Sequence, residues 1–374
     1  MSVERERWID SWKGLLILLV VLGHVVGMMS HFTTGRMQDA FLYAYRFIYF
    51  FHMPAFFMLV GVIAGAGEKT DEGLSFAFIA RKFKRLMIPY FFWGVVSVLI
   101  FLLMTALTSG VFVGNGYYRY FKFDFPWWQP FLSLLHAGFW PNGDGFRCNS
   151  VLWFLPCMFL VLLSRKAIQG FNPKSNNTTI PNLKSNNLKS NNLTIPLLLL
   201  CLTLGGVLRL YAGLLPWCLD RVPRFLAFVL LGEFVARWRW SIGCGWQIAG
   251  LLVGWAIFAA GVVVLPDFGV MYVSWAWYFA EAGMAVLGCV LSMGVARLVD
   301  CRLLAGLGVA SLGIMLTHKF PIVAIQAVIG KCDRLTFGSV ATGLLIAFGI
   351  AVLVTALAWG VARVMPRSVG GTKG

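Results

Sequence analysis

Long apolar runs separated by short polar stretches dominate the sequence and predict its architecture. A helix needs about 20 residues to cross roughly 30 Å of hydrocarbon, and most of the runs approach or exceed that length. The runs occupy residues 11–31, 41–66, 86–109, 150–166, 195–212, 223–240, 245–265, 270–296, 303–330 and 336–363. We therefore predict an all-α integral membrane protein, a single domain over residues 1–374 with about ten transmembrane helices.

The distribution of basic residues predicts that both termini are cytoplasmic. About ten crossings place the two termini on one side of the membrane, and an inside N-terminus leaves most of the 31 Lys and Arg residues in inner loops. Cytoplasmic loops show this bias. We expect the first run to be a retained helix, because a cleaved signal has a shorter apolar core and a small-residue cleavage site.

Composition supports a membrane protein and excludes several other classes. Hydrophobic residues make up 59% of the chain and charged residues 12%, against about 25% charged residues in a typical soluble domain. The net charge of +16 would suggest nucleic acid in a soluble protein, but the inner-loop bias explains it here, so no nucleic-acid partner is expected. The chain has no C-x-x-C pair, P-loop, Gly-rich dinucleotide turn, G-x-S-x-G or His-Glu-x-x-His pattern. We expect neither a metal nor a tightly bound cofactor.

Two long polar segments interrupt the apolar pattern. The outer segment, about 110–149, is rich in aromatic residues, which indicates a packed cover, a sugar-stacking surface or rings that lie in the lipid interface. The inner segment, about 167–194, repeats Lys-Ser-Asn-Asn and has the composition of a flexible linker.

Three histidines lie at similar predicted depth within apolar runs. His24, His52 and His318 are each about 20–22 Å from the inner boundary at 1.5 Å per residue, and Glu281 in the eighth run falls at about the same depth. Ionisable residues inside a membrane are costly, so by default they suggest a function. The structural alternative is a histidine hydrogen-bonded to a neighbouring helix.

Asp10 and Lys13 precede His24 on one face of the first predicted helix. Lys13 and His24 are eleven residues apart, which at about 100° per residue places them on one side of the helix and about 16 Å apart along its axis. Asp10 and Lys13 have an i,i+3 ion-pair spacing. Gly23 and Gly27 flank His24 and allow a neighbour to approach closely.

A basic run, with Arg81, Lys82 and Arg85, opens the third predicted helix from the inner side. Such clusters often contact lipid phosphates, while Lys82 and Arg85, three residues apart, could also grip the phosphates of a ligand. Trp153, near the start of the fourth helix, is either an interfacial anchor or part of a cavity wall.

These motifs together resemble the acyltransferase-3 family of membrane acyltransferases, and its polysaccharide and fucose O-acetyltransferase branch most. The resemblance rests on Lys13 and His24 with ten residues between them, Phe51-His52-Met53-Pro54, Arg85 with Pro89-Tyr90, Trp153-Phe154-Leu155, and the stretch from Ser311 to His318. These motifs cover most of the chain in the family's order. Two positions depart from it: Lys82 replaces the first of a pair of arginines, and Met315 stands where an aromatic is expected.

The resemblance implies a multi-pass inner-membrane enzyme that O-acylates an envelope glycan or lipid-linked sugar from cytoplasmic acyl-CoA, usually acetyl-CoA. We expect His24 to act as general base or transient acyl carrier, since imidazole exchanges protons near neutral pH. Asp10 and Lys13 would orient the entrance of the site. Arg81, Lys82 and Arg85 would hold the donor, and His52, Trp153, Glu281 and His318 would face the acceptor. The alternative is a transporter or flippase whose His and Glu residues relay protons, although the sequence shows no convincing internal repeat.

Overall fold

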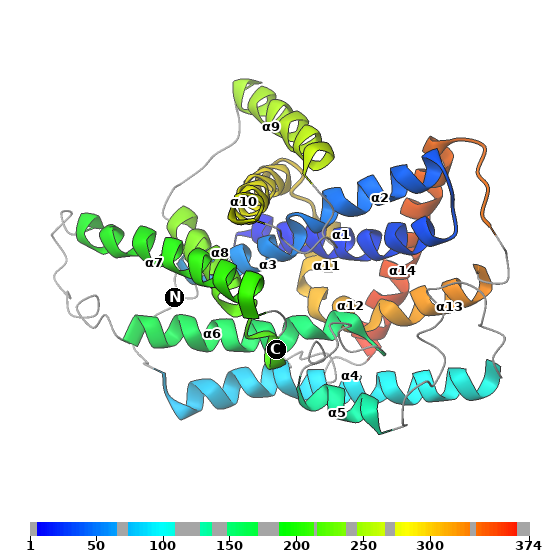
Figure 1. Ribbon diagram of the computed structural model, residues 1–374, viewed down its shortest axis with the longest axis horizontal. Coiled ribbons are helices and arrows are strands. Elements are labelled where there is room, and N and C mark those ends of the chain that lie inside the picture. The colour runs from blue at the N-terminus through cyan, green and yellow to red at the C-terminus, as the bar shows by residue number, and fades with distance from the viewer. Residues whose placement is uncertain are drawn as a thin grey trace.

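In the computed structural model, every element of the described part of the chain is a helix, which confirms the predicted all-α class (Figure 1). The structure describes residues 6–65, 74–108, 128–136, 148–170, 187–212, 215–236, 245–265, 274–329 and 334–364. Nine helices in these ranges are long and apolar enough to cross a membrane. They are Arg7–His31, Arg36–Gly65, Phe76–Ile100, Ser150–Gly170, Thr194–Ala212, Gly245–Val264, Trp275–Leu298, Ser311–Ile329 and Val340–Val364.

Most of the predicted runs correspond to single helices. These are α1 (Arg7–His31), α4 (Phe76–Thr108), α6 (Phe154–Gly170) after the short η2 (Ser150–Trp153), α7 (Asn187–Val207), α8 (Val222–Ala236), α9 (Gly245–Val264), α10 (Trp275–Leu298) and α14 (Val340–Val364). Helix α8 is the counterpart of the predicted run 223–240; its 15 residues are fewer than the roughly 20 that a full crossing needs. Helix α4 starts ten residues before the predicted run 86–109, so the basic run lies within it.

The second predicted run is two helices. Helix α2 (Arg36–Tyr49) ends before Phe50, and α3 (His52–Gly65) begins after Phe51. Pro54 explains the break, because its ring cannot donate a hydrogen bond and clashes with the carbonyl of the residue four positions earlier, Phe50. As a result His52 is the first residue of a helix.

The predicted run 303–330 is also divided, into α11 (Arg302–Val309), α12 (Ser311–Thr317) and α13 (Lys319–Ile329). The expectation of one continuous helix here is wrong. Pro321 leaves the carbonyl of Thr317 without its helical N–H donor, which explains the end of α12 at that residue. His318 lies at this break.

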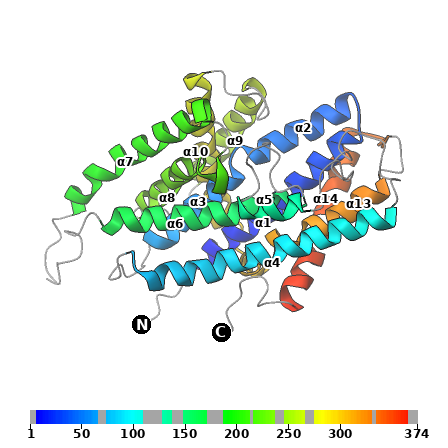
Figure 2. The same cartoon turned by 60° about the horizontal axis from the view of Figure 1, so that its bottom comes forward.

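Helix α1 lies in the middle of the bundle, in contact with α2, α3, α10, α11, α12, α13 and α14. Two crossings are close enough to require glycine. A Cβ atom on Gly308 of α11 would lie 1.9 Å from the carbonyl oxygen of Asp10, and one on Gly232 of α8 would lie 2.0 Å from that of Met58 in α3. Figure 2 shows α4 and α6 side by side along one face of the molecule.

The two long polar segments fall partly outside the described residues. Of the outer segment, residues 128–136 contain α5 (Gln129–Leu135), and 148 and 149 precede η2. Of the inner segment, α6 continues to Gly170 and α7 begins at Asn187, inside the stretch predicted to be a linker. Residues 109–127, 137–147 and 171–186 lie outside the described residues.

Candidate functional site

A cavity of about 650 Å³ lies in the half of the bundle that contains the C-terminal end of α1. Its wall includes His24 and His31 of α1, Tyr49 of α2, His52 of α3 and Lys319 of α13. The cavity extends to two exposed residues, His31 at the end of α1 and Leu42 within α2. On the predicted topology this is the outer half of the membrane.

Two of the three histidines that the sequence placed at similar depth, His24 and His52, line this cavity, and His318 lies behind the lining next to His24. The rings of His24 and His318 lie 5.3 Å apart, and the hydroxyl of Tyr49 is 3.2 Å from Nδ1 of His24. The ring of Tyr49 also lies edge-on to His52, with a centroid distance of 4.6 Å. Tyr49 thus contacts His24 and His52, and His318, which follows α12, contacts His24.

Two of these histidines have a fixed tautomer. Nδ1 of His52 is 2.9 Å from the carbonyl oxygen of Ile48, and Nδ1 of His318 is 3.0 Å from that of Ile314. A carbonyl only accepts, so Nδ1 carries the proton in both rings and Nε2 keeps its lone pair. Nε2 of His318 is buried and has no hydrogen-bond partner among the described residues. His318 therefore presents an acceptor nitrogen close to His24.

Gly23 and Gly27 allow the tyrosines of α2 to lie against α1 beside His24. A Cβ atom on Gly23 would approach Tyr49 to 2.9 Å, and one on Gly27 would approach Tyr45 to 3.0 Å. The rings of Tyr45 and Tyr49 are stacked with centroids 3.9 Å apart. The close approach therefore sets the position of the hydroxyl that binds His24.

Asp10 and Lys13 form the predicted ion pair, with Nζ of Lys13 3.7 Å from Oδ1 of Asp10. Neither is among the described residues that line the cavity. Leu16 and Ile17 separate Lys13 from His24 along α1, and both side chains are fully buried. Helix α1 thus carries the pair and the histidine on one face, with a packed stretch between them.

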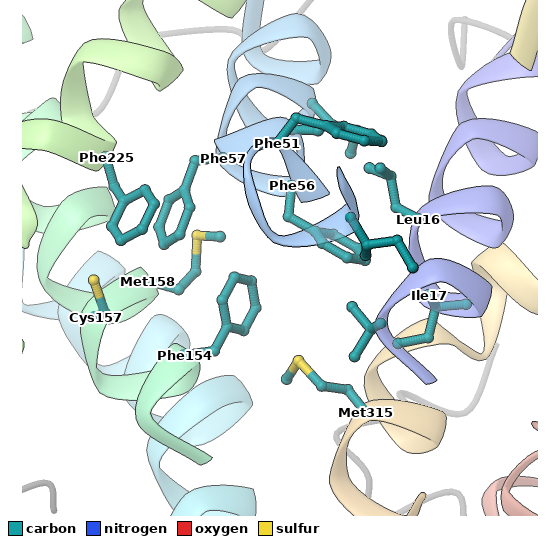
Figure 3. Packing of buried hydrophobic residues seen from close by; sticks show 14 of the residues in the cluster. Leu16, Ile17, Phe51, Phe56, Phe57, Phe154, Cys157, Met158, Phe225 and Met315 are labelled. Atoms are coloured by element: carbon teal, nitrogen blue, oxygen red, sulfur yellow. The ribbon is translucent and has the colours of Figure 1, made fainter. Parts of the chain in front are cut away.

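Six buried apolar residues of α1, α3 and α6 form what we call the inner packed layer: Leu16, Ile17, Phe56, Phe57, Cys157 and Met158 (Figure 3). None of them is among the described residues that line the cavity. In α1, α3 and α6 these residues lie directly beyond residues that line the cavity, namely Val20, Pro54 and Phe154. The rings of Phe57 and Phe154 are 5.3 Å apart, so the cavity wall and the layer pack continuously.

The predicted donor residues lie at the N-terminal end of α4, away from the cavity lining. Nζ of Lys82 and the guanidinium of Arg81 lie 5.2 and 5.8 Å from the ring centroid of Phe78, and Nζ of Lys166 in α6 lies 5.6 Å from it. Arg85 is exposed. The structure therefore groups Arg81 and Lys82 with Lys166, a residue that the sequence did not single out, in a cationic cluster.

Trp153 and Glu281 line the cavity beside arginines that the sequence reasoning missed. Nη2 of Arg224 is 2.7 Å from Oε1 of Glu281, and the guanidinium of Arg221 lies 4.7 Å from the Trp153 ring centroid. Arg209 also lines the cavity. Two signals in the sequence could have identified these residues. Arg221 and Arg224 lie toward the outer side, where the positive-inside rule predicts few basic residues. Arg209 and Lys319 are basic residues inside apolar runs.

Comparison with known proteins gives a match over nearly the whole chain. A family model described as an acyltransferase domain, the acyltransferase-3 model, matches residues 6–363. Over 93 residues the chain is 35% identical to nodulation protein NolL of Sinorhizobium fredii; this stretch covers 24% of the chain and 24% of NolL. The chain thus matches about a quarter of the length of that curated relative. No solved structure matches the chain.

Proposed function

Because the chain belongs to the acyltransferase-3 family and is a membrane acyltransferase, we propose that it moves an acetyl group from cytoplasmic acetyl-CoA to a hydroxyl of an envelope or exopolysaccharide sugar. The observation that carries the proposal is the position of His24, on the wall of a membrane-embedded cavity, within 3.2 Å of the Tyr49 hydroxyl and beside His318. We place the enzyme in the inner membrane, where cytoplasmic donor and envelope acceptor are both within reach.

The proposed reaction is a direct transfer with His24 as general base. The imidazole takes the proton of the acceptor hydroxyl while the oxygen attacks the thioester carbonyl carbon. The new C–O bond forms and the C–S bond breaks. The leaving CoA thiolate then receives the proton from the imidazolium, so CoA leaves as the free thiol and the ring is neutral again.

The hydrogen bond to Tyr49 determines which ring nitrogen of His24 is free to accept a proton. If Nδ1–H donates to the phenol oxygen, Nε2 keeps the lone pair that a base needs. The donor would be held at the inner surface, where Arg81, Lys82 and Lys166 surround Phe78. Its phosphates suit these cations. To reach His24, its acyl arm would have to displace side chains of the inner packed layer between α1, α3 and α6.

Replacing His24 with alanine tests the proposal. General base catalysis contributes about 10²- to 10⁴-fold, so we expect a loss of that size in acyl transfer from radiolabelled acetyl-CoA to envelope glycan in isolated membranes. His136→Ala is the matched control, because this histidine follows α5 and is not among the described residues that line the cavity. Equal activity in the two variants would remove His24 from the mechanism.

A separate measurement distinguishes a base from a covalent acyl carrier. Purified enzyme is mixed with labelled acetyl-CoA in the absence of acceptor and quenched within one turnover. We expect no label on the protein, because the general-base route passes the acyl group directly to the acceptor. A labelled peptide containing residue 24, absent from His24→Ala, would instead assign His24 as the carrier.

A further inference from the structure

The part of the cavity wall that residues 205–225 form is rich in arginine. Arg209, Arg221 and Arg224 line it together with Asp220 and Glu281. With Lys319, the described lining holds four basic side chains and two carboxylates. Charge inside a membrane is costly unless it is paired or meets a ligand of opposite sign.

Ion pairs account for the two carboxylates. Glu281 binds Arg224 at 2.7 Å, and Oδ2 of the fully buried Asp220 side chain lies 3.6 Å from Nε of Arg221. Arg209 and Lys319 are the other two basic side chains of the described lining. In addition, Nε of Arg224 is buried and has no hydrogen-bond partner among the described residues. A buried donor of this kind is expensive to leave unmatched, and an oxyanion would satisfy it.

The backbone that carries these arginines departs from regular geometry. Arg209 lies in η4 (Leu208–Ala212), a π-helical turn that continues α7, and such turns are frequent at functional sites. Trp217 and Cys218, both in the short helix η5 (Pro216–Cys218), have positive φ angles of 58° and 56°. Left-handed conformations of non-glycine residues are unfavourable and cluster at ligand sites.

Hydrogen bonds maintain the unusual path between η5 and α8. The N–H of Trp217 donates to the carbonyl of His136 at 3.0 Å, and the N–H of Leu215 donates to Oδ1 of Asp220 at 3.2 Å. Asp220 and Arg221 directly follow this segment and line the cavity. Asp220 and Arg221 form an ion pair there, and the Arg221 guanidinium lies over the Trp153 ring.

We propose that this group of arginines, the arginine site, binds an acceptor that carries an oxyanion, either a sugar carboxylate or the phosphate of a lipid-linked sugar. This inference rests on the proposed acyl transfer to sugars and names the acceptor class. Arg209, Arg221 and Nε of Arg224 bind the oxyanion, and the acceptor hydroxyl then lies in the same cavity as His24. Arginine suits this role because its planar guanidinium pairs with carboxylate or phosphate in bidentate fashion.

Two acceptor pairs test the proposal with purified full-length enzyme and acetyl-CoA. The first compares methyl glucuronide with methyl glucoside, and the second compares a polyprenyl-pyrophosphate-linked sugar with the same sugar on neutral polyprenol. We expect a higher kcat/KM for the charged member of one pair, and the pair that responds identifies the carboxylate or the phosphate as the group recognised.

Arg209→Gln and Arg221→Gln should each reduce that preference by about 10- to 100-fold, the loss expected for one hydrogen bond to a charged group. The neutral acceptor should be affected far less. Arg36→Gln is the matched control, since Arg36 is exposed at the start of α2 and is not among the cavity-lining residues. Equal use of charged and neutral acceptors in both pairs, or an equal loss on both in the glutamine variants, would overturn the inference.

A binding measurement keeps the inference separate from the proposed function. Inorganic pyrophosphate or glucuronate should raise the unfolding temperature of the wild-type protein in detergent, and should fail to do so with Arg209→Gln. If neither anion stabilises the wild type more than glucose does, the arginine site is refuted even if acyl transfer occurs. If an anion stabilises it but no sugar is acylated, the proposed function fails and the anion site stands.

Discussion

At the scale of single residues, Tyr49 contacts two of the three histidines, His24 and His52. Its hydroxyl is 3.2 Å from Nδ1 of His24, and its ring lies against His52. Tyr49→Phe removes the hydroxyl and keeps the stacked ring. We expect kcat to fall about 5- to 10-fold with KM unchanged, since a typical hydrogen bond is worth about 1 kcal/mol and this one orients the base.

Tyr43→Phe is the matched control for this measurement. The hydroxyl of Tyr43 donates to the carbonyl of Ala259 at 2.9 Å, and Tyr43 is not among the described residues that line the cavity. The measurement is kcat and KM of the Tyr49→Phe and Tyr43→Phe variants by steady-state kinetics. A similar fall in kcat for both would mean that Tyr49 acts through general packing and does not position His24.

The sequence analysis identified the three histidines but not Tyr49. His24, His52 and His318 were found because an imidazole is rare inside an apolar run and counting residues gives its depth. Tyr49 was missed because tyrosine is common in membrane helices near the interface. Its partner depends on the rotation of α2 against α1, which a single sequence does not give.

At the scale of helices, the crossing of α3 and α8 depends on the absence of a side chain at Gly232. Its Cβ would lie 2.0 Å from the carbonyl oxygen of Met58, a backbone atom that cannot move aside. Gly232→Ala should therefore destabilise the protein by about 1–3 kcal/mol, the usual cost of overpacking. The measurement is the unfolding temperature in detergent, followed by tryptophan fluorescence.

Gly349→Ala in α14 is the control for this substitution. A Cβ there meets no atom of the described structure within 4 Å, and alanine is the better helix former, so the change should be neutral or slightly stabilising. An equal effect at the two positions would contradict the close crossing. A second pair, Gly308→Ala in α11 against the same control, tests the contact with Asp10.

The helical elements were predictable to the extent that hydrophobicity defines them. Length and apolarity gave the spans, but the breaks at Phe50 and His318 depend on Pro54 and Pro321, which a membrane helix can also accommodate with a kink. Tertiary contacts decide between a kink and a break. These breaks matter for function, because they place His52 and His318 at helix ends that border the cavity.

At the scale of the whole molecule, the residues proposed to bind acceptor and donor lie in two separate regions. One is the cavity with the histidines and the arginine site, and the other is the cationic cluster around Phe78. The sequence pointed to the histidines and to Arg81 and Lys82, but it did not point to the arginine site. The inner packed layer lies between the cavity and the ends of α1 and α6 on the inner side. Side-chain packing of this kind cannot be derived from spacing alone.

The inner packed layer has a consequence for the energetics of the cell membrane. A polar cavity that reaches His24 admits water deep into the bilayer, so the apolar side chains beyond it are the remaining resistance to proton leak. Phe57→Ala with Met158→Ala should therefore speed the collapse of a pH gradient across proteoliposomes, as reported by an entrapped fluorescent dye. The lipid-facing Phe348→Ala should not, because Phe348 is 48% exposed on α14. Equal rates of proton leak in the double variant and in Phe348→Ala would show that other parts of the protein block proton leak.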